Sequence, residues 1–564
     1  MHNCAIDYYP TTFSADGPLV MGVNAANEGL INGLIRHATV DALVCHVRNE
    51  GEAKDFQARV ERLGQGHRPH TMVRNGDTVA LGRVGALFHP APGFGPLAWV
   101  RRFGPQHAYS LCGISHTTAT ERVLDSIGNL MVAPVQPWDA VICTSTVVRR
   151  TYDRVLADWR DYLADRVGGR PFCPVQLPII PLGVDVAAFA ADATRDAAGQ
   201  ALRRQFGMGV DDIIILWVGR FNHRGKAHPI PAYLAVERMA TQLKAPPAGG
   251  GAGRRVLFLQ CGWFHDGDTR DAFIQAALDH APTALHAFID GRDPVARRGA
   301  WSAADIFLSL PDNIQETFGL TPIEAMAAGL PVVVSDWNGY RDTVRHGVDG
   351  FRIPTWMPPE GDGGDLAKAF TTGALSGDAY TGAACQAIGV DVGACANALL
   401  RLAEDPALRR RMGAAGQRRA ADVYDWRHII AAYQDLWAEL ARIRASAAAV
   451  APRADGAPAH PLRADPFGSF ASYATLALDD DTALRLGGVV SADRLTALRQ
   501  SPLNQSAFPP LGDEMLCRAV LDRLARGSVR LGDLMGAYQG SDATLLRRTV
   551  SWLAKMGLVD LARG

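Results

Sequence analysis

Short runs of Val, Ile and Leu alternate with helical patterns up to about residue 440. Within each run, residues on both faces are apolar, so each strand is expected to be buried on both sides. Strands of this type belong to parallel sheets covered by helices, which predicts an α/β fold. The clearest runs are residues 42–47, 140–145, 213–219, 255–262, 305–309 and 331–335.

These strands form two groups, one before about residue 185 and one after about residue 210. The grouping predicts two doubly wound, Rossmann-like domains that face each other across a cleft, at 1–200 and 201–423. An amphipathic helix is expected at 424–447, because Ile429, Ile430, Tyr433, Leu436, Trp437 and Leu440 recur at helical spacing. Residues 357–392 are rich in Gly, Asp and Ala, which indicates an insertion or a long loop.

The composition changes beyond residue 447. Residues 448–466 are rich in Ala and Pro, which is typical of a linker. Residues 467–564 predict a small, mainly helical module, and the run from Leu545 to Val559 has the pattern of a winged-helix helix entering a turn. Because basic and acidic residues nearly balance there, we favour a packing or dimerisation module.

The charge and cysteine content exclude several classes of protein. The chain has 57 basic and 58 acidic residues, so no nucleic-acid partner held by phosphate contacts is expected. The nine cysteines are scattered, which indicates reduced thiols. No secretory signal is evident, and no apolar run approaches the roughly 20 residues that span a bilayer. We expect a cytoplasmic protein without a transmembrane segment, while peripheral membrane contact stays open.

The densest chemical signal is the run from Gln315 to Glu324, which follows a buried strand and enters a helix. Thr321-Pro-Ile-Glu predicts a capping box and a helix that starts near Thr321. The positive end of that helix would suit a phosphate, through the amides of Phe318, Gly319 and Leu320.

Two carboxylates belong to this run. Glu324 has a structural interpretation, as the partner of the Thr321 cap, beside a functional one. Glu316 has no such structural role. It lies on a loop at the carboxyl end of a parallel strand, where open α/β sheets bind ligands.

Two cations follow an earlier strand. Arg220 ends the run Trp217-Val-Gly-Arg, and Lys226 follows a short polar loop. Together they could converge on a diphosphate, Arg220 by its bidentate fork and Lys226 as a point charge. The alternative is that both are solvated loop cations.

Two weaker signals lie in the first domain. Gly22, in a glycine-containing loop that runs into a helix, would let the backbone approach a ligand closely. His116 follows a short strand-like run, and a structural histidine is the alternative there. His223 and His228 share a loop, but no carboxylate or cysteine stands at ligand spacing, so no metal site is predicted.

The pattern Glu-Thr-Phe-Gly-Leu-x-x-x-Glu-Ala-Met-Ala-x-Gly-x-Pro-Val-Val resembles the signature of the retaining GT-B glycosyltransferases of family 4, the group 1 glycosyltransferases. Further segments accompany it in the family's order: Ile180-Pro-Leu-Gly-Val-Asp, Val218-Gly-Arg, Ala304-Asp-Ile-Phe-Leu-Ser and Gly347-Val-Asp-Gly-Phe. The resemblance covers roughly residues 15–445. It implies a GT-B fold, with the acceptor on the first domain, the donor on the second, and a final helix that crosses back to the first.

The resemblance also implies roles for single residues. Glu316 would hold hydroxyls of the transferred sugar, and His116 would contact that sugar near the reaction centre. Glu324 would accept hydrogen bonds from the ribose. The diphosphate would lie among Arg220, Lys226, the amides of Phe318, Gly319 and Leu320, and the loop at Gly22.

The implied activity is transfer of a hexose from a nucleotide diphosphate sugar, UDP- or GDP-linked, to an acceptor hydroxyl with retained configuration. The acceptor would be a glycan, a lipid-linked molecule or a protein, and neither a metal nor a cofactor is implied. Two alternatives remain. One is another enzyme of this architecture, a sugar-nucleotide epimerase or a glycosyl phosphorylase. The other is a catalytically silent scaffold that binds a glycan or a partner.

Overall fold

The computed structural model describes residues 3–14, 22–190, 192–245, 253–488, 490–505, 511–536 and 541–563. The chain divides into two compact units, Met1–Ala459 and His460–Gly564. The division falls inside the segment 448–466 that composition predicts to be a linker.

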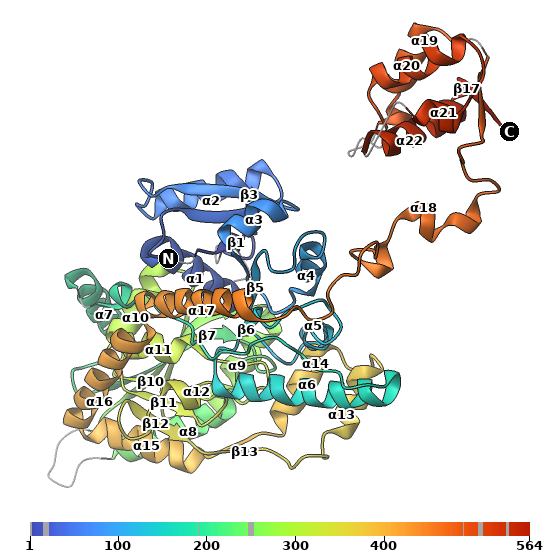
Figure 1. Cartoon of the computed structure of the whole chain (residues 1–564). Helices are drawn as coiled ribbons and strands as arrows, with labels where there is room; N and C mark the ends of the chain where they lie inside the picture. The colour runs from blue at the N-terminus through green and yellow to red at the C-terminus, as the bar shows by residue number, and fades with distance from the viewer. Residues whose placement is uncertain are drawn as a thin grey trace. The chain divides into compact units, whose positions relative to one another are not determined.

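The first sheet, in the part of the chain drawn in blue to cyan in Figure 1, consists of six parallel strands. Their order is β3-β2-β1-β4-β5-β6. Its strands are β1 (Ala5–Asp7), β2 (Leu43–Val47), β3 (His70–Arg74), β4 (Ala86–His89), β5 (Ser110–Ile114) and β6 (Ala140–Ile142). The helices that alternate with them are α1 (Gly22–His37), α2 (Glu50–Arg62), α3 (Thr78–Val84), α4 (Gly95–Arg101), α5 (Glu121–Asn129) and α6 (Thr146–Val167).

The second sheet repeats this topology, with the order β12-β11-β10-β7-β8-β9. Its strands are β7 (Ile213–Phe221), β8 (Val256–Phe264), β9 (Leu285–Asp290), β10 (Ile306–Ser309), β11 (Val332–Ser335) and β12 (Gly350–Ile353). Its helices are α7 (Ala193–Gln205), α8 (Ile230–Lys244), α9 (Gly267–His280), α10 (Pro294–Ala303), α11 (Leu320–Ala327), α12 (Tyr340–Thr343), α15 (Val392–Glu404) and α16 (Pro406–Arg419). Two doubly wound parallel sheets confirm the predicted GT-B fold.

Each sheet reverses its strand order at one place, between β1 and β4 in the first and between β7 and β10 in the second. The connections on the two sides of such a switch point leave in opposite directions, which opens a crevice at the carboxyl ends of the strands. The fold therefore predicts one ligand-binding position on each domain.

The change from the first domain to the second lies before α7. This helix spans residue 200, where the sequence-based boundary was placed, and it packs on α10 of the second domain. A Cβ added to Gly199 would lie 2.7 Å from Ser302. The close packing of these two helices explains why the boundary cannot fall within α7.

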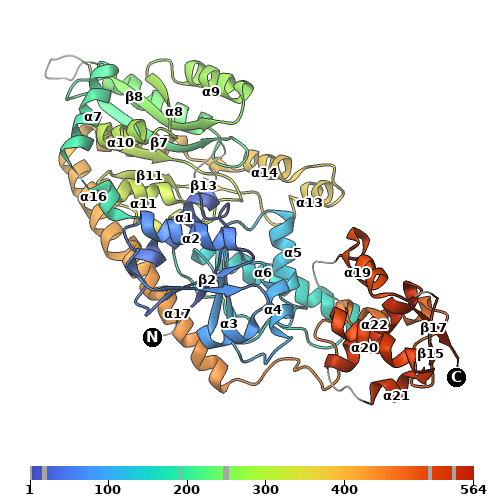
Figure 2. The same ribbon diagram turned by 90° about the horizontal axis from the view of Figure 1, so that it is seen from above.

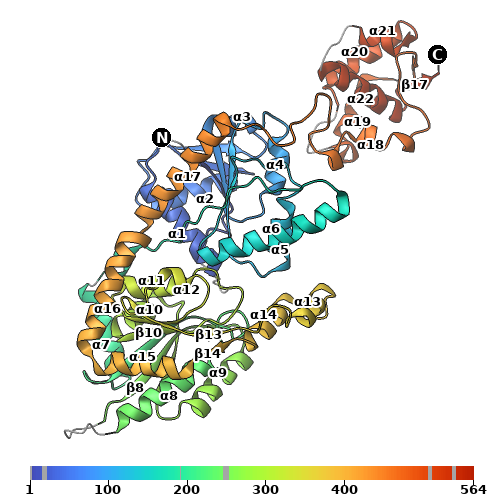
Figure 3. The same cartoon turned by 60° about the horizontal axis from the view of Figure 1, so that its bottom comes forward.

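Helix α17 (Trp426–Ser446) follows a short π-helix, η2 (Ala420–Tyr424), and packs against α1 of the first domain (Figure 3). At its start the Trp426 indole lies against three glycines, Gly29 and Gly33 of α1 and Gly183. A Cβ added to any of them would lie 3.0 Å or less from the indole. The absence of side chains at these positions lets the returning helix dock closely.

The segment 357–392 is more ordered than the loop that its composition suggests. It contains α13 (Gly364–Thr371) and α14 (Gly377–Gln386), which pack on each other. A two-stranded antiparallel pair, β13 (Thr355–Trp356) and β14 (Gly389–Val390), closes its base. Contacts between α13 and α14 and the β13–β14 pair hold the insertion together, although its composition rich in Gly, Asp and Ala is typical of a loop.

The C-terminal unit combines helices with a small antiparallel sheet of order β16-β15-β17 (Figure 2). Its main elements are β15 (Ala483–Leu486), α19 (Ala492–Gln500), α20 (Glu514–Ala525), β16 (Val529–Arg530), α21 (Leu531–Met535), α22 (Ser541–Lys555) and β17 (Val559–Ala562). Short helical turns, η3 (Pro461–Arg463), α18 (Pro466–Ser469), η4 (Ala471–Tyr473) and η5 (Pro502–Asn504), complete it. An apolar core of its own, with Leu484, Leu521 and Leu546, makes it a separate unit.

The nine cysteines are free thiols, and all but Cys173 are buried. Among the described residues, no helix has both the length and the apolar character needed to cross a membrane.

The packing of Trp426 against three glycines predicts a measurable contribution of its indole to stability. We expect Trp426→Ala to lower the free energy of unfolding of the two-sheet unit by about 3–5 kcal/mol, because the indole is 5% exposed and its loss leaves a cavity. Trp356→Ala is the matched control, since Trp356 is 57% exposed and should change stability by less than about 0.5 kcal/mol. Chemical denaturation followed by circular dichroism measures both, and equal effects would contradict the assignment.

Candidate active site

The candidate site lies at the switch point of the second sheet. There β7 ends in Arg220 and Phe221, and the loop after β10 carries Glu316 toward the start of α11. A small crevice at this place is lined by Trp217, Val218, Lys226, Ala227, Ser309, Pro311, Glu316, Thr321 and Tyr340. The loops after β7 and β10 therefore meet, as the sequence predicts.

Glu316 and Lys226 form an ion pair, with 2.9 Å between Lys226 Nζ and a Glu316 carboxylate oxygen. Burial alone would raise the pKa of Glu316. The charge and hydrogen bond of Lys226, with the amides of Thr317 and Phe318, instead hold this pKa below its usual value. Glu316 is therefore ionised at neutral pH. The Phe318 amide faces this carboxylate and so is committed within the protein.

Asn313 organises the loop that carries this pair. Its side-chain oxygen accepts hydrogen bonds from the backbone amides of Gln315 and Glu316, at 3.0 and 2.9 Å. Its side-chain amide donates to the carbonyl of Lys226. Asn313 thus joins the loops after β7 and β10. An Asn shortly after a buried strand is a turn signal that the sequence analysis left unused.

Gly319 determines how α11 begins. Its φ is 83°, and a Cβ there would lie 1.8 Å from the Tyr340 ring. The helix starts at Leu320 with Gly319 as its N-cap and no capping side chain. The predicted capping box at Thr321 is therefore wrong, because the helix starts earlier and places Thr321 inside its first turn.

Glu324 therefore does not act as the partner of a Thr321 cap. Its carboxylate makes no hydrogen bond that the described residues supply, although burial raises its pKa against the opposing charges of Arg297 and Lys226. Glu324 is half-buried, so its carboxylate is partly withdrawn from water and lacks a hydrogen bond from the described residues, which leaves it available to a ligand.

Arg220 is the second uncommitted group. Its guanidinium is half-buried at the end of β7, and burial lowers its pKa while Asp378 of α14 opposes that shift. Within the described part of the chain it forms no hydrogen bond. Arg220 does not line the crevice that contains Lys226. The two predicted cations both lie at the carboxyl end of β7, but only Lys226 lies in the crevice with Glu316.

The first domain contacts this loop directly. The Thr317 hydroxyl donates to the carbonyl of His116 at 2.8 Å, and the Ser145 hydroxyl donates to the carbonyl of Thr317 at 2.8 Å. The Thr146 amide donates to Asp342 at 2.6 Å. Since His116 follows β5 and Ser145 follows β6, the carboxyl edges of the two sheets meet at the Glu316 loop.

His116 is neutral at physiological pH. Burial lowers its pKa to about 4, although the carbonyl of Pro90 favours the protonated form. Its Nε2 atom is buried and has no hydrogen-bond partner. The structural interpretation of His116 thus accounts for one ring nitrogen and leaves the other available to a ligand.

Gly22 is the first residue of α1, and none of the described residues lies within 4 Å of the position of its missing Cβ. Residues 15–21 of the predicted glycine loop lie outside the described residues.

The insertion supports the donor-side loops. The Gln315 side chain donates to Thr381 of α14 at 3.2 Å, and the Cys385 thiol donates to the Asp312 carboxylate at 3.0 Å. Burial raises the pKa of Asp312 to about 6. Within the described ranges, no three His, Cys, Asp or Glu side chains are grouped to hold a metal ion.

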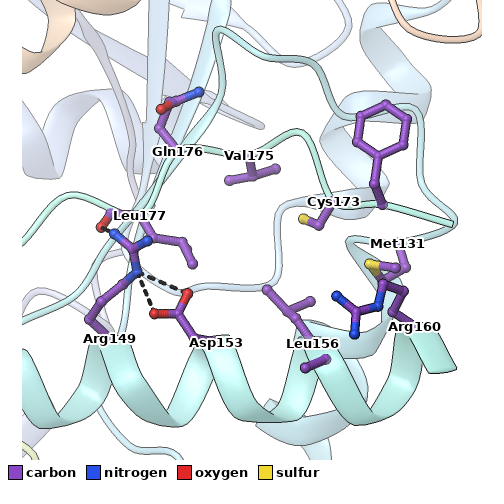
Figure 4. Close-up of a pocket in the computed structure, with 11 residues that line it drawn as sticks. Met131, Arg149, Asp153, Leu156, Arg160, Cys173, Val175, Gln176 and Leu177 are labelled. Atoms are coloured by element: carbon purple, nitrogen blue, oxygen red, sulfur yellow. Dashed lines mark hydrogen bonds and ion pairs between the residues drawn. The ribbon is translucent and has the colours of Figure 1, made fainter. Parts of the chain in front are cut away.

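A second cavity, of about 360 Å³, lies along α6 and the segment 172–177 (Figure 4). There Arg149 pairs with Asp153 and donates to the carbonyl of Leu177. None of the site residues predicted from the sequence lines this cavity.

The chain is similar to known glycosyltransferases over part of its length. Residues 200–358 match the model of the group 1 glycosyl transferases. The chain is 28% identical over 338 residues to a D-inositol 3-phosphate glycosyltransferase of Xylanimonas cellulosilytica, covering 58% of this chain and 66% of that protein. It is 29% identical over 248 residues to a phosphatidyl-myo-inositol mannosyltransferase of Mycobacterium tuberculosis, covering 44% and 50%. It therefore spans less than two thirds of the length of these relatives.

Among solved structures, Anabaena Alr3699/HepE in complex with UDP is 16% identical and covers 78% of this chain and 100% of its own, with a TM-score of 0.45. Because this score is below 0.5, the fold assignment depends on the strand order described above.

The Lys226–Glu316 pair makes a testable contribution to stability. We expect Lys226→Met to destabilise the protein by about 1–3 kcal/mol at pH 7, because it leaves a largely buried carboxylate unpaired. Adding Glu316→Gln should recover part of that loss. Since the pKa of Glu316 is lowered in the folded state, the contribution of the pair is present above the usual value of 4.5 and lost as the pH falls through the folded pKa. Urea denaturation of both single variants and the double variant at pH 7 and pH 4 measures the coupling, and additive effects at pH 7 would contradict it.

Proposed function

We propose that this chain, a member of the group 1 glycosyltransferases, transfers a hexose from a nucleotide diphosphate sugar to an acceptor hydroxyl with retained anomeric configuration. The observation that carries the proposal is the switch point of the second sheet, where the Lys226–Glu316 pair lies beside the start of α11. The names of the relatives, both glycosyltransferases, support the same class of reaction.

The diphosphate would bind beside positive groups that the described residues leave without a full set of hydrogen bonds. Arg220 has no hydrogen bond to the described residues, and the amides of Gly319 and Leu320 lie at the positive end of α11. Lys226 would exchange part of its contact with Glu316 for a phosphate oxygen. As the sugar–phosphate bond breaks, these groups stabilise the negative charge that develops on the leaving diphosphate. The proposal requires no metal ion or cofactor.

The carboxylates would contact the sugars of the donor. Glu324 would accept hydrogen bonds from the ribose, which explains why no protein group satisfies it. Glu316 would hold hydroxyls of the transferred hexose and oppose the positive charge that develops on its ring. His116, whose neutral Nε2 lacks a partner, would contact the same sugar from the first domain.

The reaction would take place between the two carboxyl edges. The acceptor oxygen forms a bond to the anomeric carbon as the bond to the diphosphate breaks, and the acceptor proton leaves on the phosphate. The proposed donor is a UDP- or GDP-linked sugar, and the proposed acceptor is a glycan, a lipid-linked molecule or a protein. The proposed location of the reaction is the cytoplasm. Contact between the domains at Thr317 would exclude water and suppress hydrolysis of the donor.

Donor binding is the first test. We expect UDP or GDP to raise the melting temperature of the full chain, because a ligand that binds the native state stabilises it by mass action. Arg220→Ala should reduce the affinity for the diphosphate at least about tenfold and leave the affinity for the nucleoside unchanged. Isothermal calorimetry measures both, with the exposed Arg411→Ala as control. Equal losses for nucleotide and nucleoside would indicate a folding defect and contradict the assigned role.

Turnover is the second test. We expect Glu316→Gln to leave the donor affinity within a few-fold and to lower turnover at least about a hundredfold, the effect of one lost electrostatic contact in a transition state. Release of nucleoside diphosphate from sugar nucleotides measures turnover, and the exposed Glu404→Gln serves as control. Near-normal turnover of Glu316→Gln would exclude Glu316 from the chemistry. Donor binding without any release would support a silent scaffold instead.

A further inference from the structure

The switch point of the first sheet carries a polar cluster that the donor side does not use. Asp7 ends β1, His46 lies on the adjacent β2, and His89 ends β4 on the other side of β1. Asp7 and His89 therefore flank the position where a doubly wound sheet opens its ligand crevice.

Asp7 is held by three donors. One of its carboxylate oxygens lies 2.9 Å from His46 Nδ1 and 2.8 Å from the Arg48 guanidinium, and the other lies 2.8 Å from His89 Nδ1. Burial alone would raise the pKa of Asp7, but its contacts with His46 and His89 hold this pKa well below its usual value. The Asp7 side chain is 1% exposed, so the centre of the cluster lies in the interior of the first domain.

This arrangement determines the tautomer of His89. An ionised carboxylate only accepts hydrogen bonds, so Nδ1 of His89 carries the proton that points to Asp7, and in this tautomer Nε2 is the ring's acceptor. Nε2 forms no hydrogen bond with the described residues, and the side chain is 19% exposed. His46 is tied to Asp7 in the same way but is only 2% exposed. His89 is thus the member of the cluster that can reach a ligand.

His89 lies next to the donor-side loop. The following residue, Pro90, supplies the carbonyl that faces the His116 ring, and the carbonyl of His116 accepts a hydrogen bond from Thr317, the neighbour of Glu316. A short chain of contacts thus links the first switch point to the proposed position of the transferred hexose.

We propose that His89 binds the acceptor, by accepting at Nε2 a hydrogen bond from a hydroxyl adjacent to the one that attacks. This inference rests on the proposed function. The attacking oxygen forms its bond to the anomeric carbon and its proton leaves on the phosphate, so His89 takes no proton. Asp7 acts as a positioning residue, because it holds the ring and its tautomer.

The cluster fits a neutral polyol, a sugar or a cyclitol. The guanidinium of Arg48 is already engaged by Asp7, by Glu52 and by the carbonyl of Tyr8. The Arg48 guanidinium also lies 3.4 Å from the centre of the Tyr9 ring. Because Arg48 is engaged within the protein, the group left to a ligand is Nε2 of His89, which in the tautomer fixed by Asp7 accepts a hydrogen bond from a hydroxyl.

The test compares two acceptors in one reaction. The full chain is incubated with a sugar nucleotide that it turns over, in the presence of myo-inositol or methyl α-mannopyranoside together with methanol. Methanol has one hydroxyl and cannot use His89, so the ratio of polyol product to methyl glycoside, measured by mass spectrometry, isolates recognition of the second hydroxyl.

Two substitutions of His89 separate its nitrogens. Asn places an amide near Nδ1 and can keep the hydrogen bond to Asp7, whereas Gln places one near Nε2. We expect His89→Asn to lower the product ratio about tenfold or more and His89→Gln to lower it less, with hydrolysis and binding of the nucleoside diphosphate unchanged. His70→Asn, on the edge strand β3, is the control.

An unchanged ratio in His89→Asn would overturn the proposal, as would a lack of preference for either polyol over methanol in the unmodified chain. Both outcomes leave donor binding and hydrolysis intact, and so leave the proposed function standing. Failure to bind or turn over any sugar nucleotide would overturn the proposed function and this inference together.

Discussion

The rest of the site depends on the contact between Thr317 and the first domain. Thr317 donates to the carbonyl of His116 and accepts from the Ser145 hydroxyl, so one residue joins the ends of β5 and β6 to the loop after β10. Both hydrogen bonds use backbone carbonyls, of His116 and of Thr317, in loops that follow the strands. This contact brings the carboxyl edge of the first sheet to the loop that carries Glu316. The seat of Trp426 among Gly29, Gly33 and Gly183 ties the two domains together at a second place.

The polar groups of the cleft fall into two kinds, those satisfied within the protein and those that are not. Asp7, Arg48 and Asn313 are fully engaged, and they position other groups. Arg220, Glu324 and the Nε2 atoms of His89 and His116 have no such partners among the described residues. Because an unsatisfied polar group in a buried place is costly, the second kind marks the positions where a ligand is expected. Lys226 and Glu316 lie between the two kinds, since each satisfies the other until a ligand enters.

Sequence patterns were most informative where a strand is apolar on both faces. The six strongest runs all form strands, and the loop with Glu316 follows β10 as expected. Patterns were less informative where local and tertiary signals compete. Thr321-Pro-Ile-Glu is a good capping box by composition, yet Gly319 must lie against Tyr340 with a positive φ, and this contact starts the helix earlier. Residues 357–392 are rich in Gly, Asp and Ala, which is typical of a loop, yet they form α13 and α14, which pack on each other. The cluster at Asp7 left no signal, because its members are spread from β1 to β4.

The amino-acid sequence by itself determined the class of fold, the two sheets and the carboxylates and cations of the donor loops, because strand burial and short motifs are local properties of the chain. Only the tertiary structure decided which of those groups are free. Neighbours that are distant in sequence decide whether Arg220 forms a hydrogen bond within the protein and whether Glu324 caps a helix. They also decide that His89 forms a hydrogen bond with Asp7. A side chain's type is written at its own position, whereas its partners, and hence its availability to a ligand, are set by how the sheets and helices pack.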